Sequence, residues 1–236
     1  MAGSPRYLTK SRFSLAMECP AKLFYTGKKE YANRKLEDPF LEALAEGGFQ
    51  VGELARRYFP GGILIDEIRH KEAEEMTSEL MKRDSVTLFE PAFRFGNLFI
   101  RADILAKDGN SLHLIEVKAK SWDSSEPDSF FTKKGNIPSG WKSYIYDVAF
   151  QTYVLGNAMP GFEVEPFLMM ADKSALCPTD GLNQKLRIRL GHDDGKRIEI
   201  YGDLTPDDLS PRILVQVPVG DCVDAVLSGS VDDFSD

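Results

Sequence analysis

Residues 98–118 read LFIRADILAKDGNSLHLIEVK, and this stretch decides the fold. On both sides of the central Asp108-Gly109 dipeptide, the residues follow strand patterns, with polar side chains such as Arg101, Asp103 and Glu116 set among apolar neighbours. Asp-Gly is also a preferred dipeptide in the tight turn of a β-hairpin. The stretch therefore predicts two antiparallel strands, Leu98–Ala106 and Ser111–Lys118, joined by this turn.

The register of this hairpin decides which side chains share a face. Side chains alternate between the two faces of a strand, so Glu116 and Lys118 lie on the same face. If the loop contains two residues or four, Asp103 lies opposite Leu114, and Glu116 lies diagonally across from Asp103, roughly 7–8 Å away. A three-residue loop would place the two acids on opposite faces. The even loop lengths predict that Asp103, Glu116 and Lys118 converge.

Two carboxylates at this separation can bracket a hard divalent cation, which takes oxygen ligands. A charged lysine cannot bind the metal, but it can orient or deprotonate an attacking water, or neutralise a phosphoryl oxygen. Together these groups would form a phosphodiester-hydrolysing centre. The alternative is structural: Arg101 lies opposite Glu116 in this register and would form a cross-strand ion pair. Asp103 and Lys118 would then lie on a solvated face of the sheet.

The flanking segments supply the other elements of an α/β fold. Helices are predicted over residues 9–17, 20–25, 39–59, 70–83, 144–155 and 218–227, and further strands over 63–65, 86–93 and 164–170. A second hairpin is predicted from residues 185–190 and 197–201, around the Asp194-Gly195 turn. Residues 28–37 are predicted to form a charged connection, and residues 121–140 a mobile loop. This order predicts one α/β domain with a mixed sheet.

The charge is unevenly distributed along the chain of 236 residues. It carries 29 Lys and Arg against 37 Asp and Glu, a net charge of −8, which argues against a protein that coats nucleic acid with bulk positive charge. Residues 1–36 nevertheless hold eight basic and two acidic side chains, whereas residues 192–236 hold eleven acidic and three basic ones. We expect a basic N-terminal surface and an acidic C-terminus that is a candidate surface for a protein partner.

Cysteine content and hydropathy indicate the compartment. Three scattered cysteines are too few for a disulfide framework and are typical of reducing conditions. No apolar run approaches the ~20 residues of a membrane span, and the N-terminus lacks the apolar core of a signal peptide. We therefore predict a cytoplasmic protein without a membrane partner.

The ordered set Asp103, Glu116-Val117-Lys118 and a helix bearing Gln151 resembles the PD-(D/E)XK nuclease superfamily. The chain is similar to its RecB-like family, including CRISPR-associated RecB-type exonucleases and longer uncharacterised bacterial nucleases. The resemblance covers residues 8–172. It is carried by LTKSRFSLAMECPAKLFY (8–25), TLFEPAFRFGNLFIRADIL (87–105), LIEVKAKS (114–121) and YDVAFQTYVL (146–155).

This resemblance implies a restriction-endonuclease-like core with a central mixed sheet flanked by helices. Residues 38–172 would form that core. Residues 1–37 would be a basic helical segment, and 173–236 an acidic C-terminal β/α appendage packed on the core.

The resemblance also implies roles for individual residues. Asp103 and Glu116 would bind Mg²⁺ or Mn²⁺, with the carbonyl of Val117 as a third ligand, and Lys118 would be the catalytic lysine. Glu90 resembles an acidic residue that some members use as an extra ligand. The alternative for Glu90 is a solvated carboxylate on a strand.

Gln151 matches the glutamine of the RecB-type final motif, which contacts substrate or the backbone of the site. Relatives have a tyrosine four residues later, where this chain has Leu155, so Tyr153 is the nearest candidate for substrate binding. Lys120 is a further candidate on a second basic rim. Asp147 lies one helical turn before Gln151 and would either reach the metal or pair with a lysine.

Two features of the relatives are incomplete in this chain. Many have a histidine ligand on the first long helix, where this chain has Gln50 and Glu53. The CRISPR-associated relatives hold an iron–sulfur cluster, which needs four cysteines, whereas this chain has Cys19, Cys177 and Cys222. Cys19 would bind a cluster only if further cysteines lie beyond this chain. Its alternative is a small buried hydrophobe.

Basic and aromatic side chains interleave near the N-terminus, a composition typical of single-strand binding. They are Lys10, Arg12, Phe13, Lys22, Phe24, Tyr25, Lys28, Lys29, Tyr31, Arg34 and Lys35. The expected function is metal-dependent hydrolysis of DNA, single-stranded or at duplex ends, by an exonuclease of repair, recombination or defence. The alternative is a catalytically degenerate nucleic-acid-binding or assembly module of a larger nuclease complex.

Overall fold

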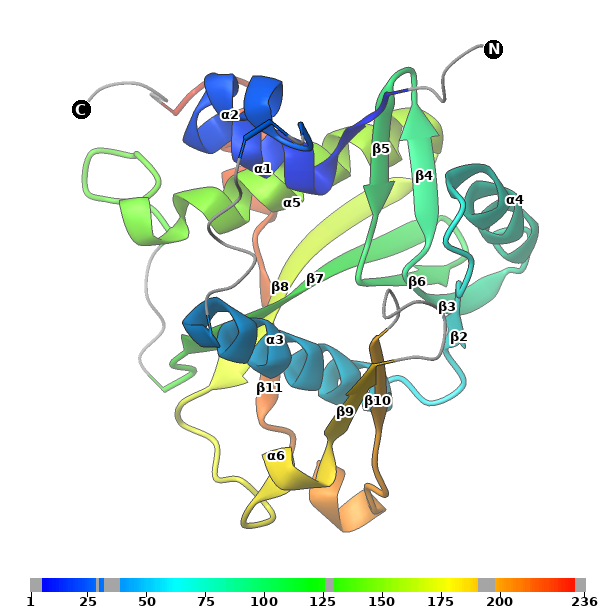
Figure 1. The fold of residues 1–236 in the computed structure, drawn as a ribbon, viewed down its shortest axis with the longest axis vertical. Coiled ribbons are helices and arrows are strands. Elements are labelled where there is room, and N and C mark those ends of the chain that lie inside the picture. The colour runs from blue at the N-terminus through cyan, green and yellow to red at the C-terminus, as the bar shows by residue number, and fades with distance from the viewer. Residues whose placement is uncertain (1–5, 29, 32–38, 126–129, 191–197, 232–236) are drawn as a thin grey trace.

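A six-stranded mixed sheet forms the centre of the molecule in a computed structural model that describes residues 6–28, 30–31, 39–125, 130–190 and 198–231 (Figure 1). Its strand order is β11-β8-β7-β6-β3-β2. The strands are β2 (Ile63–Leu64), β3 (Ser85–Phe89), β6 (Ile104–Asp108), β7 (Ser111–Trp122), β8 (Glu163–Asp172) and β11 (Leu214–Pro218). The α/β class with a mixed sheet is confirmed.

A second, three-stranded sheet has the order β1-β5-β4. It consists of β1 (Leu8–Thr9), β4 (Ala92–Phe95) and β5 (Leu98–Arg101), with β1 parallel to β5. A separate antiparallel pair, β9 (Arg187–Leu190) and β10 (Ile198–Tyr201), forms the predicted second hairpin. Its Asp194-Gly195 turn lies outside the described residues, as does most of the predicted connection over 28–37.

The predicted helices are present, with shifted ends. They are α1 (Lys10–Glu18), α2 (Pro20–Tyr25), α3 (Pro39–Arg57), α4 (His70–Leu80), α5 (Ser139–Ala158) and α7 (Gly220–Leu227). The structure adds two short elements that were not predicted, α6 (Leu182–Lys185) and a 3₁₀ turn (Pro206–Leu209). Thr9 caps α1 by accepting a hydrogen bond from the N–H of Arg12. Over the ranges described, none of the helices combines the length and the apolar character needed to cross a bilayer.

Helices cover both faces of the central sheet. On one face, Leu54 and Ala55 of α3 pack against Ile104, Ile115 and Met169. On the other face, α5 and α7 pack over the strands and α1 lies against α5 (Figure 1). Burial of this apolar surface stabilises the fold by ~25 cal/mol per Å² and fixes α5 above the face that carries Glu116.

The two long strands predicted over 86–93 and 98–106 are each broken in two. Glu90 has a positive φ of 55°, and Pro91 has no N–H to donate to a ladder, so β3 ends and β4 begins there in the smaller sheet. The second break falls at Ala102 and Asp103, between β5 and β6. These breaks transfer the chain between the two sheets and leave Asp103 at the junction.

The predicted hairpin register is wrong by two residues. Asp108 pairs with Ser111, so the loop starts at Gly109 and Leu105 lies opposite Leu114. This register also pairs the apolar Ile104 with Ile115, whereas the predicted one would have opposed Ile104 to a histidine, and apolar cross-strand pairs stabilise a sheet. The side chains keep the predicted faces because a shift of two preserves the alternation.

The expected loop over 121–140 is partly ordered by aromatic packing. β7 continues to Trp122, whose ring stacks on Phe130 at 4.9 Å between centroids, and Trp141 of α5 contacts both rings. Ile137 is also buried. The described parts of this segment are therefore anchored to α5. The polar composition of the segment predicted a mobile loop instead.

Candidate metal centre

Asp103 and Glu116 lie across from each other at the junction of the two sheets. The Oδ2 atom of Asp103 accepts a hydrogen bond of 2.7 Å from the backbone N–H of Val117. The Glu116 side chain, in the middle of β7, is 1% exposed, and the Asp103 side chain is 26% exposed. The register that pairs Ile104 with Ile115 makes the two carboxylates direct neighbours rather than the diagonal ones expected.

The ammonium group of Lys118 lies between two carboxylates. Its Nζ atom is 2.7 Å from Glu116 Oε1 and 2.7 Å from Asp147 Oδ2. Glu116 and Lys118 therefore reach the same side of β7, as the alternation predicts. Of the two roles foreseen for Asp147, the structure has the ion pair with a lysine.

Gln151 extends from α5 to the same acid. Its side chain is completely buried, and its Nε2 atom donates a hydrogen bond of 2.8 Å to Glu116 Oε2. The helix and the central sheet are thereby joined at the site. The strand β7 and the helix α5 therefore fix the orientation of the Glu116 side chain before any ligand binds.

A second lysine belongs to the site, although we expected it on the N-terminal surface. The Nζ atom of Lys10 is 3.0 Å from both Oε1 and Oε2 of Glu116 and 3.4 Å from Asp103 Oδ1. The parallel pairing of β1 with β5 brings it there. No sequence pattern signals this contact, because 93 residues separate Lys10 from Asp103 and a two-residue strand has no periodicity to read.

Burial and charge shift the pKa values of these four groups. Burial raises the pKa of Asp103, and the charge on Glu116 raises it further, to about 7. Burial also acts to raise the pKa of Glu116, but Lys10 and Lys118 outweigh it and hold this pKa below its usual range. For each lysine, burial lowers the pKa and the neighbouring carboxylates outweigh it, so the pKa is raised. Lys118 therefore stays protonated at neutral pH and can act by its charge.

The chemistry of these donors fits a divalent cation. Asp103 Oδ1 and both oxygens of Glu116 converge on one point, since Lys10 Nζ lies within 3.4 Å of all three. Mg²⁺ and Mn²⁺ take carboxylate and carbonyl oxygens, and the carbonyl of Val117 is the further donor expected from sequence.

Unsatisfied polar atoms adjoin the same point. Among the described residues, Asp147 Oδ1 and Gln151 Oε1 are buried without a hydrogen-bond partner, and such atoms call for a water or an ion. Across the described ranges, however, no three His, Cys, Asp or Glu side chains converge as a ligand group. The candidate centre is therefore a two-carboxylate site with a lysine between the carboxylates.

The backbone of Glu90 is hydrogen-bonded to that of Asp103, but the Glu90 carboxylate pairs with two arginines. The Glu90 N–H donates to the carbonyl of Asp103 at 3.2 Å. Its Oε1 atom accepts a hydrogen bond of 2.7 Å from Arg56, and Arg101 Nε is 3.9 Å from Oε2. Glu90 could bind a metal only after giving up these arginines.

The expected alternative pairing of Arg101 with Glu116 is wrong. Arg101 donates hydrogen bonds of 2.6 Å to the backbone carbonyls of Ile65 and Glu67. It is removed from Glu116 because it belongs to β5 of the smaller sheet, where it pairs with Ala92.

Two candidate substrate-binding residues lie away from the carboxylates. Tyr153 is exposed on α5, with its ring 6.1 Å from that of Phe95. Lys120 donates to the carbonyl of Gly140 and lies over the ring of Trp141, with its Nζ atom 4.3 Å from the ring centre. The structure therefore places them beside the site's supporting helix, not against Glu116.

Gln50 and Glu53, the two side chains of α3 considered as possible metal neighbours, have other partners. Gln50 donates to the carbonyls of Asn183 and Leu186 at 3.1 and 2.9 Å, and Glu53 pairs with Arg57 at 2.8 Å. These contacts tie α3 to the C-terminal region and to itself. Neither side chain is directed to the two carboxylates by them.

Cys19 is exposed at the junction of α1 and α2. The alternative of a buried small hydrophobe is therefore wrong for Cys19, whereas Cys222 is buried. Cys177 is exposed and donates to the carbonyl of Thr179. The described cysteines are all free, and the cluster remains a prediction that depends on residues outside this chain.

The N-terminal helices present aromatic side chains to solvent. Phe24, Tyr25 and Tyr31 are exposed, and their neighbouring rings lie 5.1 and 4.8 Å apart between centroids. Lys28 Nζ lies 3.2 Å from the centre of the Phe24 ring. We call these four residues the aromatic surface. Lys29, Arg34 and Lys35 of the predicted set lie outside the described residues.

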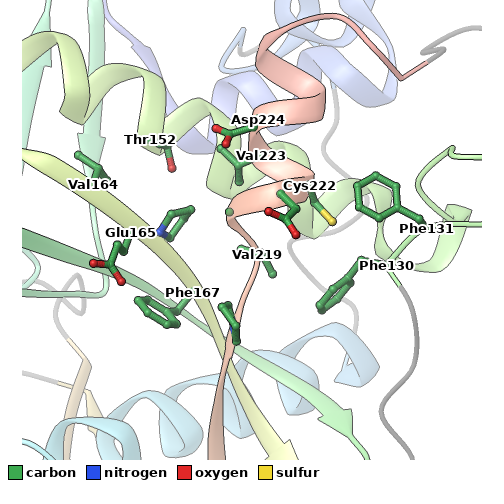
Figure 2. A pocket seen from close by; sticks show the side chains of 14 residues that line it. Phe130, Phe131, Thr152, Val164, Glu165, Phe167, Val219, Cys222, Val223 and Asp224 are labelled. Atoms are coloured by element: carbon green, nitrogen blue, oxygen red, sulfur yellow. The ribbon is translucent and has the colours of Figure 1, made fainter.

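A separate cavity of about 420 Å³ lies between β8 and α7. Figure 2 shows Phe130 and Phe131 on one side of it and Glu165 and Phe167 on the other, with Cys222 of α7 between them. Its lining includes none of the candidate site residues. It is apolar with an acidic rim and takes no part in the candidate metal centre.

Comparison with known proteins adds no relative. No family model matches the chain, and neither a curated protein nor a solved structure matches it. The function is therefore argued from the geometry of the site.

Proposed function

We propose that this chain is a divalent-metal-dependent deoxyribonuclease that hydrolyses phosphodiester bonds. One observation carries the proposal: oxygens of Asp103 and Glu116 surround a single cation position, and Lys118 lies 2.7 Å from Glu116 beside it. Two acids and a lysine on one sheet face form the minimal set for metal-assisted hydrolysis.

The chain's own residues have distinct tasks in this proposal. Asp103, Glu116 and the carbonyl of Val117 would hold Mg²⁺ or Mn²⁺, which when bound supplies Lewis acidity toward water and phosphate. Gln151 fixes Glu116, and the N–H of Val117 fixes Asp103, so both donors are oriented in advance. Lys118, which stays protonated, is placed to stabilise charge that develops on a phosphoryl oxygen.

The aromatic surface supports DNA as the substrate. Bases stack on exposed aromatic rings, and basic side chains neutralise phosphates. The same N-terminal segment reaches the site, because α2 follows α1 directly and α1 begins with Lys10. We propose an exonuclease that acts on single strands or duplex ends, with the aromatic surface as the part that binds single-stranded DNA.

The proposal also covers the type of core fold and the cellular compartment. The succession of α3, the antiparallel strands β3, β6 and β7, the crossover helix α5 and the parallel strand β8 supports a restriction-endonuclease-like core. Free cysteines support action in the cytoplasm. An iron–sulfur cluster at Cys19 would require cysteines supplied from beyond this chain.

The decisive experiment is a cleavage assay with end-labelled linear DNA, single-stranded and duplex, in Mg²⁺, Mn²⁺ or EDTA. We expect metal-dependent release of nucleotides, and at least a ~100-fold slower rate for Glu116→Gln and Lys118→Met. Lys71→Met is the matched control, since Lys71 is an exposed lysine on α4 that pairs only locally with Glu75. Cleavage that survives Glu116→Gln, or no cleavage by the folded protein, contradicts the proposal.

The second candidate is a catalytically degenerate nucleic-acid-binding or assembly module. The observation that favours it is Lys10, which stands between the two carboxylates. Such a module would bind single-stranded DNA equally well in EDTA and in Mn²⁺, and would cut neither substrate. Calorimetric titration with Mn²⁺ separates the candidates, because the module takes up no metal.

A further inference from the structure

Lys10 occupies the centre of the candidate metal site. Its ammonium group donates to both oxygens of Glu116 at 3.0 Å and to Asp103 Oδ1 at 3.4 Å. These are the oxygens that the proposed function assigns to a divalent cation. A lysine that made an ordinary surface ion pair would bind one carboxylate, whereas this one spans two, Glu116 on β7 and Asp103 at the break between β5 and β6.

The backbone at Lys10 is fixed by the elements that build the site. Leu8 and Thr9 pair with Leu98 and Phe99 of β5, the strand that leads to Asp103. The Leu8 N–H donates to the carbonyl of Asn97 at 2.8 Å. These contacts therefore fix the position of the Lys10 backbone relative to Asp103.

The helix that follows is fixed as well. The ring of Phe13 in α1 stacks on Phe150 of α5, with 4.5 Å between centroids and an interplanar angle of 8°. Phe150 is the neighbour of Gln151, which binds Glu116. Because α1 is held on both sides, Lys10 can leave the carboxylates by rotation of its flexible four-carbon side chain, without movement of the helix.

Lysine and metal cannot occupy this position together. A divalent cation binds carboxylate oxygens at 2.0–2.6 Å, and the Lys10 ammonium already fills the space between the same oxygens. An ammonium group and a metal ion bound to the same oxygens would also repel each other strongly in a poorly solvated site. Metal binding at Asp103 and Glu116 therefore requires that Lys10 move out.

We propose that Lys10 is an internal counter-ion that holds the metal position in the metal-free protein and is displaced when a divalent cation enters. It neutralises the two carboxylates when metal is scarce and raises the metal concentration needed to load the site. The inference rests on the proposed function, since it concerns the regulation of the same site.

The first test is calorimetric titration of the full chain with Mn²⁺. Lys10→Met removes the competing ammonium while keeping the length of the side chain, so the dissociation constant for Mn²⁺ should fall about tenfold or more. Lys71→Met, which removes one exposed positive charge on α4, should leave it within about twofold of the wild-type value. Adding Glu116→Gln to Lys10→Met should abolish the tight binding. An unchanged or weaker affinity in Lys10→Met overturns the inference.

The second test uses the wild-type protein and does not depend on the folding of a variant. Lysines are acetylated briefly with an N-hydroxysuccinimide ester, with and without Mn²⁺, and the sites are quantified by mass spectrometry. We expect acetylation of Lys10 to increase at least severalfold with Mn²⁺, because its amine leaves the carboxylates, while Lys71 is unchanged. Equal labelling of Lys10 in both conditions overturns the inference.

The outcomes separate this inference from the proposed function. If the wild type and Lys10→Met bind Mn²⁺ equally and both cut DNA, the nuclease stands and the role of Lys10 is wrong. If neither binds Mn²⁺, both are wrong. If only Lys10→Met binds Mn²⁺, Lys10 blocks the site permanently, and displacement by metal is wrong.

Discussion

Gln151 and Glu116 are joined by a hydrogen bond of 2.8 Å that runs from the amide Nε2 atom on α5 to the carboxylate Oε2 atom on β7. Both side chains are buried, and 35 residues separate them in sequence. The contact links α5, the helix that connects β7 to β8, to the central sheet. It also sets the plane of the carboxylate that faces Asp103.

Gln151→Ala is expected to lower the free energy of unfolding by about 1–3 kcal/mol, because Glu116 loses a buried donor. It should also slow DNA cleavage, since Glu116 is no longer oriented. Urea unfolding and the cleavage assay measure both effects. Asn157→Ala is the matched control on the same helix, since Asn157 is exposed and donates only to the backbone of Tyr153. Its free energy of unfolding should stay within about 0.5 kcal/mol of the wild-type value. Equal losses in the two variants would contradict the prediction.

Glu116→Ala should lower the free energy of unfolding by about 3–5 kcal/mol, because Lys10 and Lys118 lose their common buried partner. Lys118 keeps its ion pair with Asp147, whereas Lys10 keeps only the longer contact of 3.4 Å with Asp103, so much of the loss comes from the ammonium group of Lys10. Adding Lys10→Met to Glu116→Ala should therefore recover part of it, and a double-mutant cycle from urea unfolding gives the coupling energy. A double variant less stable than Glu116→Ala would show that Lys10 stabilises the fold through other contacts.

The stability of the metal-free protein should depend on pH through Asp103. Its pKa rises from the usual 3.8 to about 7 in the folded protein, so between these values the folded state binds more protons than the unfolded state. The free energy of unfolding contributed by Asp103 therefore decreases as pH rises from about 4 to about 7. The contribution is fully present only below the unfolded pKa.

Asp103→Asn removes this titration while its amide oxygen can still accept from Val117. We expect the stability of the variant relative to the wild type to rise by about 2–3 kcal/mol between pH 5 and pH 8. Urea unfolding in EDTA at pH 5, 6, 7 and 8 measures the difference. Asp147, whose pKa is raised by burial and by repulsion from Glu116, is common to both proteins. A difference that does not change with pH would refute the prediction.

The aromatic surface should contribute to DNA binding independently of catalysis. Stacking of one base on an aromatic ring contributes about 1–3 kcal/mol, so Phe24→Ala and Tyr25→Ala should each weaken single-strand binding roughly 5- to 100-fold. Fluorescence anisotropy with a labelled oligonucleotide in EDTA, at one stated salt concentration, measures the change. Phe49→Ala, which alters an exposed ring on α3, serves as the control. If all three variants bind alike, the aromatic surface is not the DNA-binding surface.

Alternation along 98–118 was sufficient to predict the hairpin and the faces of its side chains. It could not give the register, because a two-residue loop at 108–109 and one at 109–110 shift the pairing by two residues and leave every side chain on the same face. The choice between them depends on packing: only the observed pairing places Leu105 against Leu114 and Ile104 against Ile115. The breaks at Glu90 and Asp103 were hidden for a similar reason, since they arise where the chain passes between two sheets.

The part of the site that sequence could not predict comes from long-range contacts. Lys118 and Glu116 are two residues apart, and strand geometry alone brings them together. Lys10 reaches the same carboxylate only through the parallel pairing of β1 with β5. The strand β11, at residues 214–218, was likewise missed, because it completes the edge of the central sheet only once β8 is in place.

The distance in sequence between Lys10 and Glu116, 106 residues, has a consequence for biosynthesis. Helix α1 is synthesised before β5 and β7, so Lys10 meets its partners only after both strands have left the ribosome, and contacts between distant segments form late in folding. Until then, Asp103 and Glu116 lack the contact with Lys10, and Lys118 is the cation beside Glu116. The order of translation therefore makes the contact between Lys10 and the two carboxylates a late feature of the candidate site.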